Sequence, residues 1–391
     1  MGTGACAIHG GRFVLPGGAV EGGYLPVENG VFGLWQAERP AGEILDYPDA
    51  WIAPGLVDTH IHGFHNHATT DVDPAGIDDA SIALAQHGTT SWLPTTFTQG
   101  VEHLGACCAA IAAADEGRGP AFAGARIQGI YLEGPFFTMK HVGAQNPEFL
   151  IDPSYDDFVL WQRRAGGRIV KSALAPERAG ALGYIARLDA EGVATCIGHS
   201  DATFDQALAA VNAGASVFVH TYNGQRGLHH REPGVVGCAM ATPNTYAEII
   251  CDGKHVKPAA IRALVATKGW QHVVPITDCL ACGGMPDGTY MSGGLPVVLA
   301  DGLARLLNAD GTTGNIAGSV LTLAQGVKNL VDWGIVTAEQ ALRMGSEVAA
   351  VSACVDRSCG FIKPGRAADF NVYRPDLTLE ATYVGGVRVA R

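Results

Sequence analysis

The sequence predicts an α/β protein: a (β/α)8 TIM barrel with a small β-sandwich domain built from both chain termini. From about residue 53, short apolar strands alternate with amphipathic stretches of helical length, which is typical of βα units and a parallel sheet. The first fifty residues and those after residue 360 instead hold short β-rich pieces broken by glycine and proline. We therefore expect a small domain from residues 1–52 and 356–391, and a barrel from residues 53–355.

Eight apolar segments are the expected barrel strands, which suits the eight βα units of a closed barrel. They span residues 56–59, 89–94, 127–132, 169–174, 194–197, 217–219, 247–251 and 273–276. Amphipathic spacing predicts helices at residues 78–87, 101–114, 176–191, 204–213 and 258–267, followed by two closing helices at 319–333 and 337–350. Strands at 370–373 and 381–389 then return to the N-terminal strands.

The composition argues against nucleic acid and membranes as partners. A formal net charge of −12 opposes binding to either acidic surface, so an anionic ligand needs a local positive cluster. The 391 residues contain no run of eighteen apolar residues. The N-terminus lacks the features of a secretory signal, and the ten cysteines are expected to be reduced thiols. These observations predict a cytoplasmic protein.

His60 and His62 follow directly on the apolar run at residues 51–58. Side chains two residues apart in a strand project to the same side, so both imidazoles can bind one metal ion. The pair is a weak signal when taken alone, because solvated and core histidines share this spacing.

Polar residues also end four other predicted strands, and they strengthen the metal interpretation. These residues are Glu133, His199, His220 and Asp278. Active sites of such barrels lie at the carboxyl ends of the strands, so we expect all of them to meet His60 and His62. Nitrogen and oxygen donors together suit Zn²⁺ or Fe²⁺ better than Ca²⁺ or Mg²⁺. Each residue alone could cap a helix or a turn, but together they predict a metal site with Asp278 as general base.

Two loops carry the positive charge that an anionic substrate would need. One spans residues 225–234 and includes His229, His230 and Arg231, and the other holds Lys254 and His255. Together they are candidates to bind a phosphate group. A solvated basic loop is the alternative.

These residues resemble the amidohydrolase superfamily and, within it, the N-acetylglucosamine-6-phosphate deacetylase family. The likeness is carried in the family's order by eight segments: 54–63, 132–136 running to 143–147, 198–200, 220–223, Leu228-His-His-Arg-Glu-Pro-Gly234, 252–255, 277–278 and 318–322. The His-x-His pair marks only the superfamily, whereas the Leu-His-His-Arg-Glu-Pro-Gly run is specific to these deacetylases.

The resemblance implies hydrolysis of the acetamido group of an N-acetylhexosamine 6-phosphate. It implies that Glu133, His199 and His220 hold the main ion, that His60 and His62 hold a second ion in some members, and that Asp278 is the general base and acid. Zinc or iron is expected, with one or two ions per subunit. The positions that match contacts to the sugar phosphate are Ala144, Gln145, Asn223, Gly224, His230, Arg231, His255, Ile316 and Ala317. Homodimers are expected, with the loop at His230 and Arg231 near the partner subunit.

Two departures from the family leave the hexosamine epimer open, gluco or galacto. Gln145 stands where many members carry His, and residues 223–225 read Asn-Gly-Gln where Asn-Ala-Met is usual. Two further alternatives stay open. Lys171 lies in a predicted strand, where a carboxylated lysine would bridge two metals in a cyclic-amide ring-opening amidohydrolase. A barrel without catalysis that binds a sugar phosphate would be expected to lack ligands or the base, and none is missing.

Overall fold

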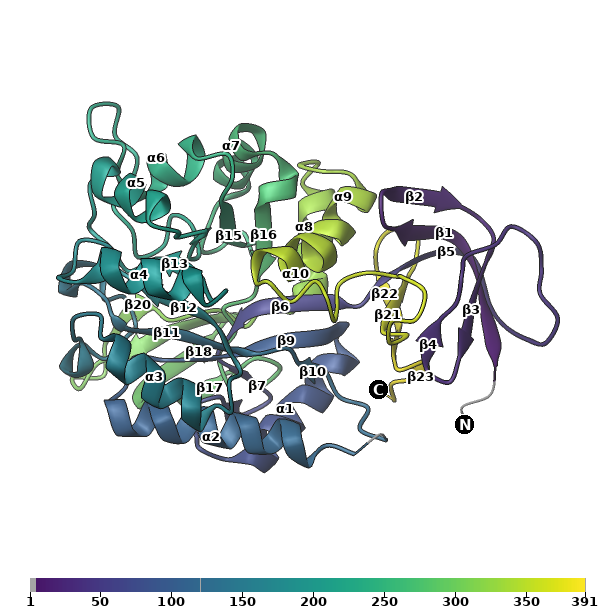
Figure 1. Cartoon of the computed structure of the whole chain (residues 1–391), viewed down its shortest axis with the longest axis horizontal. Helices are drawn as coiled ribbons and strands as arrows, with labels where there is room; N and C mark the ends of the chain where they lie inside the picture. The colour runs from purple at the N-terminus through teal and green to yellow at the C-terminus, as the bar shows by residue number, and fades with distance from the viewer. Residues whose placement is uncertain (1–4, 120, 391) are drawn as a thin grey trace.

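The computed structural model describes residues 5–119 and 121–390, and it shows a parallel barrel beside a separate sheet formed from both ends of the chain (Figure 1). The barrel lies on the left of the figure. The purple N-terminal strands and the yellow C-terminal strands lie together on the right. This architecture confirms the predicted fold class.

Eight parallel strands form the barrel and follow one another in chain order. They are β6 (Leu56–Ile61), β9 (Thr89–Thr96), β11 (Ile130–Phe136), β12 (Ile169–Leu174), β13 (Ala194–Ile197), β14 (Val217–Phe218), β15 (Tyr246–Ile250) and β16 (Val273–Ile276). A short strand, β10 (Arg126–Ile127), adds to β9. Every residue of β6, β9 and β11 is buried, as expected of parallel strands covered on both faces. Each of the eight strands overlaps its predicted segment.

The barrel is closed between its first and last strands by loop and side-chain hydrogen bonds. The backbone N–H of Asp278 donates to the carbonyl of His60 at 2.9 Å, and that of His62 donates to the carbonyl of Cys279 at 2.8 Å. The hydroxyl of Thr277 donates to Oδ2 of Asp58 at 2.6 Å. This seam places Asp278 directly beside the two N-terminal histidines.

The helices cover the outside of the barrel. They are α1 (Pro74–Gln86), α2 (Val101–Gly117), α3 (Tyr155–Arg164), α4 (Ala181–Ala190), α5 (Phe204–Asn212), α6 (Gly234–Ala241), α7 (Pro258–Lys268), α8 (Leu323–Asp332), α9 (Ala338–Arg343) and α10 (Ala349–Ser352). Short 3₁₀ turns lie at Met139–His141, Pro147–Phe149 and Trp270–His272. Within the described residues, no helix is long and apolar enough to cross a membrane.

Several helices differ from their predicted limits. α4 begins only at Ala181, because Gly180 before it has a left-handed backbone with φ of 81°. α8 begins at Leu323 rather than at residue 319. The predicted helix at 337–350 is interrupted by a π-helical turn at Met344–Val348. α3 and α6 were not among the predicted helices, although Phe158 and Trp161, the buried residues of α3, have the three-residue spacing of a helix face.

An antiparallel sheet that the sequence analysis did not predict follows β16. Its strands are β17 (Gly288–Ser292), β18 (Leu295–Ala300), β19 (Leu303–Leu307) and β20 (Thr313–Ile316). Two-residue turns join the first three strands, at Gly293-Gly294 and Asp301-Gly302, and all four turn residues have positive φ. Such dipeptides between apolar runs are strong hairpin signals, so the sequence did contain the information.

The sheet on the right of Figure 1 is mixed and joins both termini. Its strands are β1 (Cys6–Leu15), β2 (Gly18–Glu21), β3 (Tyr24–Glu28), β4 (Val31–Phe32), β5 (Glu43–Pro54), β21 (Phe370–Tyr373), β22 (Leu379–Val384) and β23 (Val387–Arg388). β5 pairs with β1 from Glu43 to Ile52 and with β21 from Trp51 to Pro54, and it leads directly into β6. The domain boundaries at 52/53 and 355/356 stay predictions, and β5 runs through the first of them.

Candidate active site and metal centre

The predicted site residues lie at the carboxyl ends of five barrel strands. His60 lies in β6, His62 just follows it, and Glu133 lies in β11. The other three, His199, His220 and Asp278, each stand two residues beyond the last residue of β13, β14 and β16. All six side chains are buried, with at most 9% of the residue surface exposed.

Glu133 occupies the centre of this group. Its Oε1 lies 3.2 Å from Nε2 of His220, 3.3 Å from Nε2 of His60 and 3.4 Å from Nε2 of His199. Its Oε2 lies 3.1 Å from Nε2 of His62. Two possible three-residue metal sites therefore share this carboxylate: His60 and His62 with Glu133, and His199 and His220 with Glu133.

The orientation of each imidazole is set by a partner on Nδ1. His62 faces the carbonyl oxygen of Thr95 at 3.1 Å, His199 that of His141 at 2.8 Å, and His220 that of Asn223 at 3.1 Å. Nδ1 of His60 instead lies 3.0 Å from Oε2 of Glu248. Because Nδ1 donates to these oxygens, each Nε2 keeps its lone pair for the centre of the site.

Three of the site residues have unusual backbone conformations. The φ angles of His199, His220 and Asp278 are 45°, 25° and 49°. Non-glycine residues with positive φ are uncommon, and they persist only where the surroundings hold them. Gly224 adds to this fit, because a Cβ there would lie 3.0 Å from Nδ1 of His199. The sharp turns after the strands direct the side chains into the mouth of the barrel.

The electrostatics of the site favour positive charge. Burial lowers the pKa of His60, but the charges of Glu133 and Glu248 outweigh it, so this pKa lies well above its usual value. Burial raises the pKa of Glu133, but the charge of His60 and hydrogen bonds from His199 and His220 bring it well below its usual value. The pKa of Asp278 is also lowered, since contacts with His62 and His60 outweigh its burial.

The residues present fit a divalent cation. Nε2 of His60 is buried and makes no hydrogen bond with the described residues, although it lies 3.3 Å from Glu133 and 3.6 Å from Asp278. A buried nitrogen without a partner, facing two carboxylates, is the environment a cation would complete. Imidazole and carboxylate are ligands of zinc and of iron.

An open cavity of 230 Å³ adjoins these residues. Six of the predicted substrate-binding residues line it: Ala144, Gln145, Asn223, Gly224, His255 and Ile316. Ala317 does not line it, because it is buried and its N–H bonds to the carbonyl of Ala304. The volume suits one small molecule rather than a macromolecular segment.

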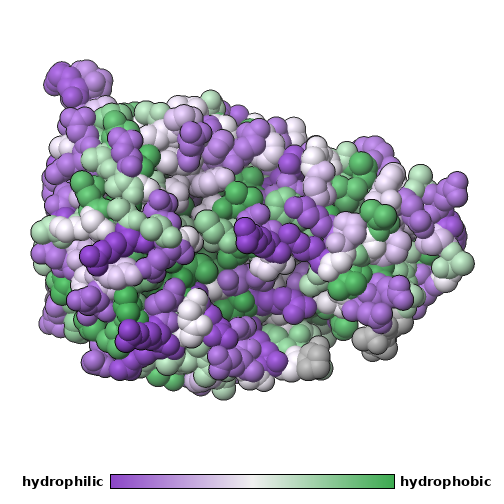
Figure 2. Space-filling model, in the orientation of Figure 1, coloured by the Kyte–Doolittle hydropathy of each residue, from purple (hydrophilic) through white to green (hydrophobic). Residues whose placement is uncertain are grey.

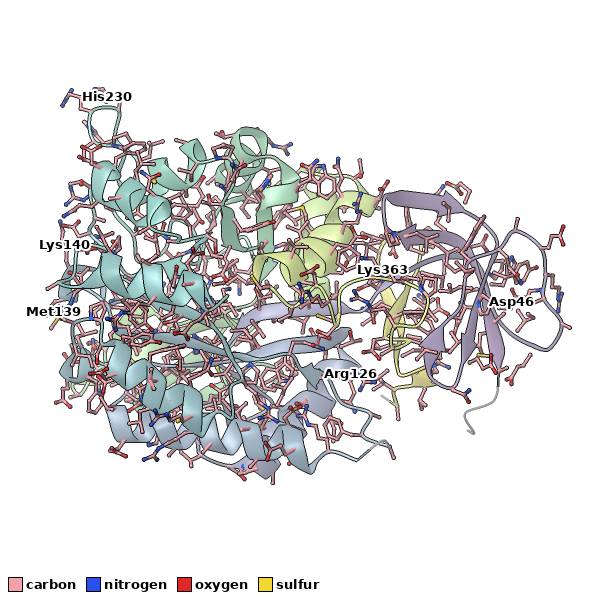
Figure 3. The ribbon with its side chains drawn as sticks, in the orientation of Figure 1. Asp46, Arg126, Met139, Lys140, His230 and Lys363 are labelled. Carbon is pink, nitrogen blue, oxygen red and sulfur yellow. The ribbon has the colours of Figure 1, made fainter. Side chains whose placement is uncertain are left out.

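His230 and Arg231 lie outside this cavity. His230 is at the tip of a loop that projects from the barrel in Figure 3, and the same projection is hydrophilic in Figure 2. Both side chains are exposed, and they contact each other at 2.9 Å. Within one chain the structure therefore does not bring them to the other candidate residues.

Sequence reasoning missed several residues that shape the site. Phe97 stacks on His62 with ring centres 3.8 Å apart, and Asn315 lines the cavity from β20. Phe97 follows β9 directly, so the carboxyl end of this strand was a usable signal. Glu248 in β15 was also missed, although a charged residue within an apolar barrel strand is a visible irregularity in the sequence.

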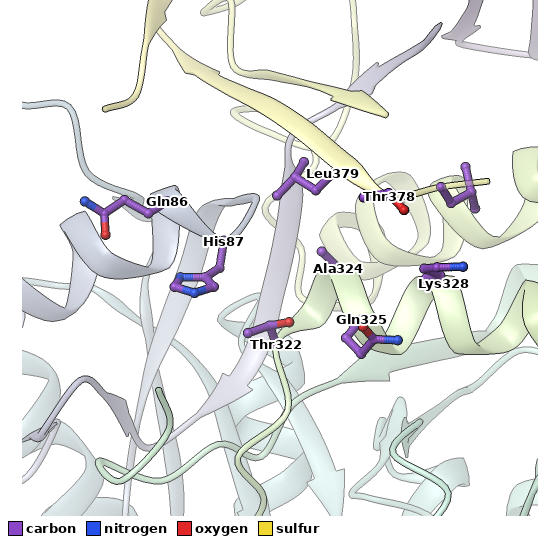
Figure 4. A pocket seen from close by; sticks show the side chains of 9 residues that line it. Gln86, His87, Thr322, Ala324, Gln325, Lys328, Thr378 and Leu379 are labelled. Atoms are coloured by element: carbon purple, nitrogen blue, oxygen red, sulfur yellow. The ribbon is translucent and has the colours of Figure 1, made fainter. Parts of the chain in front are cut away.

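A second cavity, of 510 Å³, lies where α1, α8 and β22 meet (Figure 4). His87 and Lys328 are among its lining residues, but Nδ1 of His87 bonds to the carbonyl of Ala83 and Lys328 pairs with Asp332. None of its lining residues, all of them in the described part of the chain, carries a carboxylate. The metal-ligating chemistry is thus at the barrel mouth.

Comparison with known proteins finds relatives that match most of the chain. No family model matches the chain. The N-acetylglucosamine-6-phosphate deacetylase of Vibrio furnissii is 38% identical over 335 residues, which cover 86% of this chain and 82% of that protein. The N-acetylgalactosamine-6-phosphate deacetylase of Escherichia coli O157:H7 is 37% identical over 337 residues, covering 86% of each.

Solved structures extend the likeness over the whole chain. A mutant N-acetyl-D-glucosamine-6-phosphate deacetylase from Mycobacterium smegmatis, in complex with N-acetyl-D-glucosamine-6-phosphate, superposes with a TM-score of 0.91 at 28% identity. The match covers 99% of this chain and 100% of that one. These relatives show that the chain belongs to the N-acetylglucosamine-6-phosphate deacetylase family of amidohydrolases, metal-dependent hydrolases that act on a linear amide.

Proposed function

We propose that this enzyme hydrolyses N-acetylglucosamine 6-phosphate to acetate and glucosamine 6-phosphate. The observation that carries the proposal is the Glu133 carboxylate between two histidine pairs, with Asp278 beside it, at the wall of a cavity of small-molecule size. The relative from Vibrio furnissii is named for this reaction.

Glu133, His199 and His220 would hold the main ion, and His60 and His62 with Glu133 would hold a second. Zn²⁺ fits this donor set best, with Fe²⁺ as the alternative. When bound, the ion polarises the acetyl carbonyl and lowers the pKa of the attacking water. The buried ligand side chains beside the cavity strengthen these electrostatic effects.

Asp278 would transfer the proton. Its Oδ1 lies 3.2 Å from Nε2 of His62, and the residue lines the cavity, so its carboxylate reaches both the ligand histidines and the substrate. It accepts a proton from the attacking water and then gives one to the sugar nitrogen, because an amine does not leave readily as an anion.

The sugar would be held by residues around the cavity. Nε2 of His255 is buried without a hydrogen-bond partner in the described residues, while its Nδ1 pairs with Asp252 at 2.6 Å. It is therefore an oriented donor or acceptor for a sugar oxygen. Ala144, Asn223, Gly224 and Ile316 also line the cavity, whereas Ala317 does not.

Gln145 has a second task within the site. Its Nε2 donates to Oε2 of Glu133 at 2.6 Å, and its Oε1 accepts from the N–H of Thr98 at 2.7 Å. The N–H of Thr98 fixes which end of the amide faces Glu133. We propose that Gln145 orients this carboxylate and offers its remaining N–H to the sugar.

The phosphate would be bound across a homodimer. No lysine or arginine is among the residues that line the cavity in the described chain. The nearby cations are engaged: Lys140 and Arg226 pair with Asp201, and Lys254 bonds to loop carbonyls. The exposed loop with His230 and Arg231 is then the available source of charge, and a second copy could present it to the cavity.

Subunit mixing tests this arrangement. We expect the Arg231→Ala and Asp278→Asn proteins each to have low deacetylase activity at low substrate concentration. After subunit exchange, their equal mixture should regain up to about a quarter of wild-type activity. A hybrid has one site with both Asp278 and the partner's arginine. If Arg231 acts within its own subunit, no hybrid site is complete and the mixture stays weak.

Substrate comparison tests the function itself. We expect kcat/KM for the phosphorylated gluco sugar to exceed that for unphosphorylated N-acetylglucosamine by about 10- to 100-fold, as charge-assisted hydrogen bonds would give. N-acetylgalactosamine 6-phosphate is the second candidate, because the Escherichia coli relative is named for it. A higher kcat/KM with that epimer would make it the preferred substrate. Equal kcat/KM for the phosphorylated and unphosphorylated sugars would contradict phosphate recognition.

We further propose that the protein works in the cytoplasm. Its ten cysteines are all free thiols, and eight of them are buried in the structure. Reduced thiols are usual in that compartment.

A further inference from the structure

Two charged side chains lie inside the barrel among apolar residues. Lys171 in β12 and Glu248 in β15 are both 0% exposed, and Nζ of Lys171 hydrogen-bonds to Oε1 of Glu248. Nζ also lies 3.4 Å from the carbonyl of Thr59 and 4.4 Å from the centre of the Tyr131 ring. Apolar residues of similar volume usually stabilise a core at least as well as a buried ion pair, so packing alone does not explain these charges.

The other oxygen of Glu248 reaches the metal-ligand shell. Oε2 lies 3.0 Å from Nδ1 of His60. The other three candidate ligand histidines have neutral backbone carbonyls at the same place. His60 is thus distinguished among the four by a carboxylate partner.

We propose that Glu248 is a positioning residue that orients His60 toward an ion shared with His62 and Glu133, and that Lys171 is its counter-charge. The inference rests on the metal ligands proposed above, and it adds a reason why the two ion sites differ. Glu248 contacts the imidazole of His60, whereas the imidazoles of His199 and His220 are oriented by backbone carbonyls. Oε2 of Glu248 reaches His220 only at its backbone N–H, at 3.4 Å.

The physical argument starts from the roles of the two oxygens. Oε1 accepts from the ammonium of Lys171, and Oε2 accepts Nδ1–H of His60, so Nε2 of His60 carries the lone pair. A carboxylate partner also makes the imidazole a stronger donor to a metal than a carbonyl partner does. Outer partners of this kind typically change metal affinity by about 10- to 100-fold.

Glu248→Gln exposes the role of the charge by reversing this pattern. The amide oxygen of Gln would face the Lys171 ammonium, which leaves the NH₂ group facing Nδ1 of His60. His60 must then accept at Nδ1 and carry its proton on Nε2. A protonated Nε2 has no lone pair with which to bind a metal ion. Adding Lys171→Met frees the amide oxygen to turn back toward His60. Lys171→Met alone keeps Glu248 as the acceptor.

The experiment is a Zn²⁺ titration of metal-stripped protein, with ion content per subunit measured by elemental analysis. We expect the wild type to bind two ions. Glu248→Gln should keep the first ion and bind the second about 10- to 100-fold more weakly. Lys171→Met should retain both ions, and the double variant should recover part of the second-ion affinity. Thermal unfolding shows whether each variant is folded. If Glu248→Gln does not fold, the second-ion affinity of the double variant is compared with that of Lys171→Met instead.

Matched controls separate this role from general loss of buried charge. Lys268 is also buried, and its Nζ bonds to the carbonyls of Ala239 and Thr242 outside the metal site. Lys268→Met and Glu347→Gln, the latter a buried glutamate paired with Arg343, should leave both affinities unchanged.

Three results would overturn the inference. They are a wild type that binds a single ion, a Glu248→Gln protein with unchanged second-ion affinity, and loss of the second ion in Lys171→Met but not in Glu248→Gln. Acetate release by the wild type is measured alongside. If it continues while one of these results is found, the positioning role fails and the deacetylase function stands.

Discussion

Asp278→Asn lowers kcat for acetate release by about 10²- to 10⁴-fold, the usual size of a general acid–base contribution. Asparagine has nearly the same shape and keeps a side-chain oxygen at the place of Oδ1, which lies 3.2 Å from Nε2 of His62. It cannot accept the proton of the attacking water or pass one to the sugar nitrogen. Steady-state kinetics should therefore show a fall in kcat with little change in KM.

Metal analysis distinguishes this explanation from loss of the ion. The Asp278→Asn protein is expected to keep its main ion, because Glu133, His199 and His220 are unchanged and form their own three-residue group. A variant that retains metal and more than about a tenth of the wild-type kcat would be inconsistent with Asp278 as the proton carrier.

Lys171→Met lowers the free energy of unfolding by about 3–5 kcal/mol, the typical result of leaving one partner of a buried ion pair unpaired. Glu248 would remain 0% exposed without the ammonium that Lys171 provides. Urea unfolding measures the loss. The double variant Lys171→Met/Glu248→Gln removes both formal charges and should recover most of it. A loss below about 1 kcal/mol would show that the pair does not hold the barrel together.

The same variant addresses the ring-opening alternative. In that hypothesis, Lys171 carries a carboxyl group that bridges two metal ions. The structure places Nζ against Glu248 and the carbonyl of Thr59, within the barrel. Its position supports an ion-pair role, and Lys171→Met should leave the main ion in place.

The parts of the fold that follow local pattern were predictable from the sequence. Apolar runs located all eight barrel strands, and polar residues after them located Glu133, His199, His220 and Asp278. Helix limits were less accurate where a glycine or a π-helical turn intervened, as at Gly180 and Met344–Val348. The hairpins after β16 were overlooked although their turn dipeptides are visible.

The pairings between distant segments were not predictable, because nothing local specifies them. Lys171 and Glu248 are 77 positions apart, and Glu248 is 188 positions from His60. Likewise, the carbonyls that orient His62 and His199 belong to Thr95 in β9 and to His141 in a short 3₁₀ turn, and only the assembled barrel brings them to these histidines. His230 and Arg231 show the reverse case: resemblance associated them with the phosphate, but one chain alone leaves them on an exposed loop.

The central claim is tested most directly by acetate release from N-acetylglucosamine 6-phosphate, using protein whose metal content has been assayed. We expect acetate and glucosamine 6-phosphate in equal amounts, with release that stops when metal is removed and resumes when Zn²⁺ is returned. Metal-replete protein that releases no acetate from this sugar or from its galacto epimer would contradict the account.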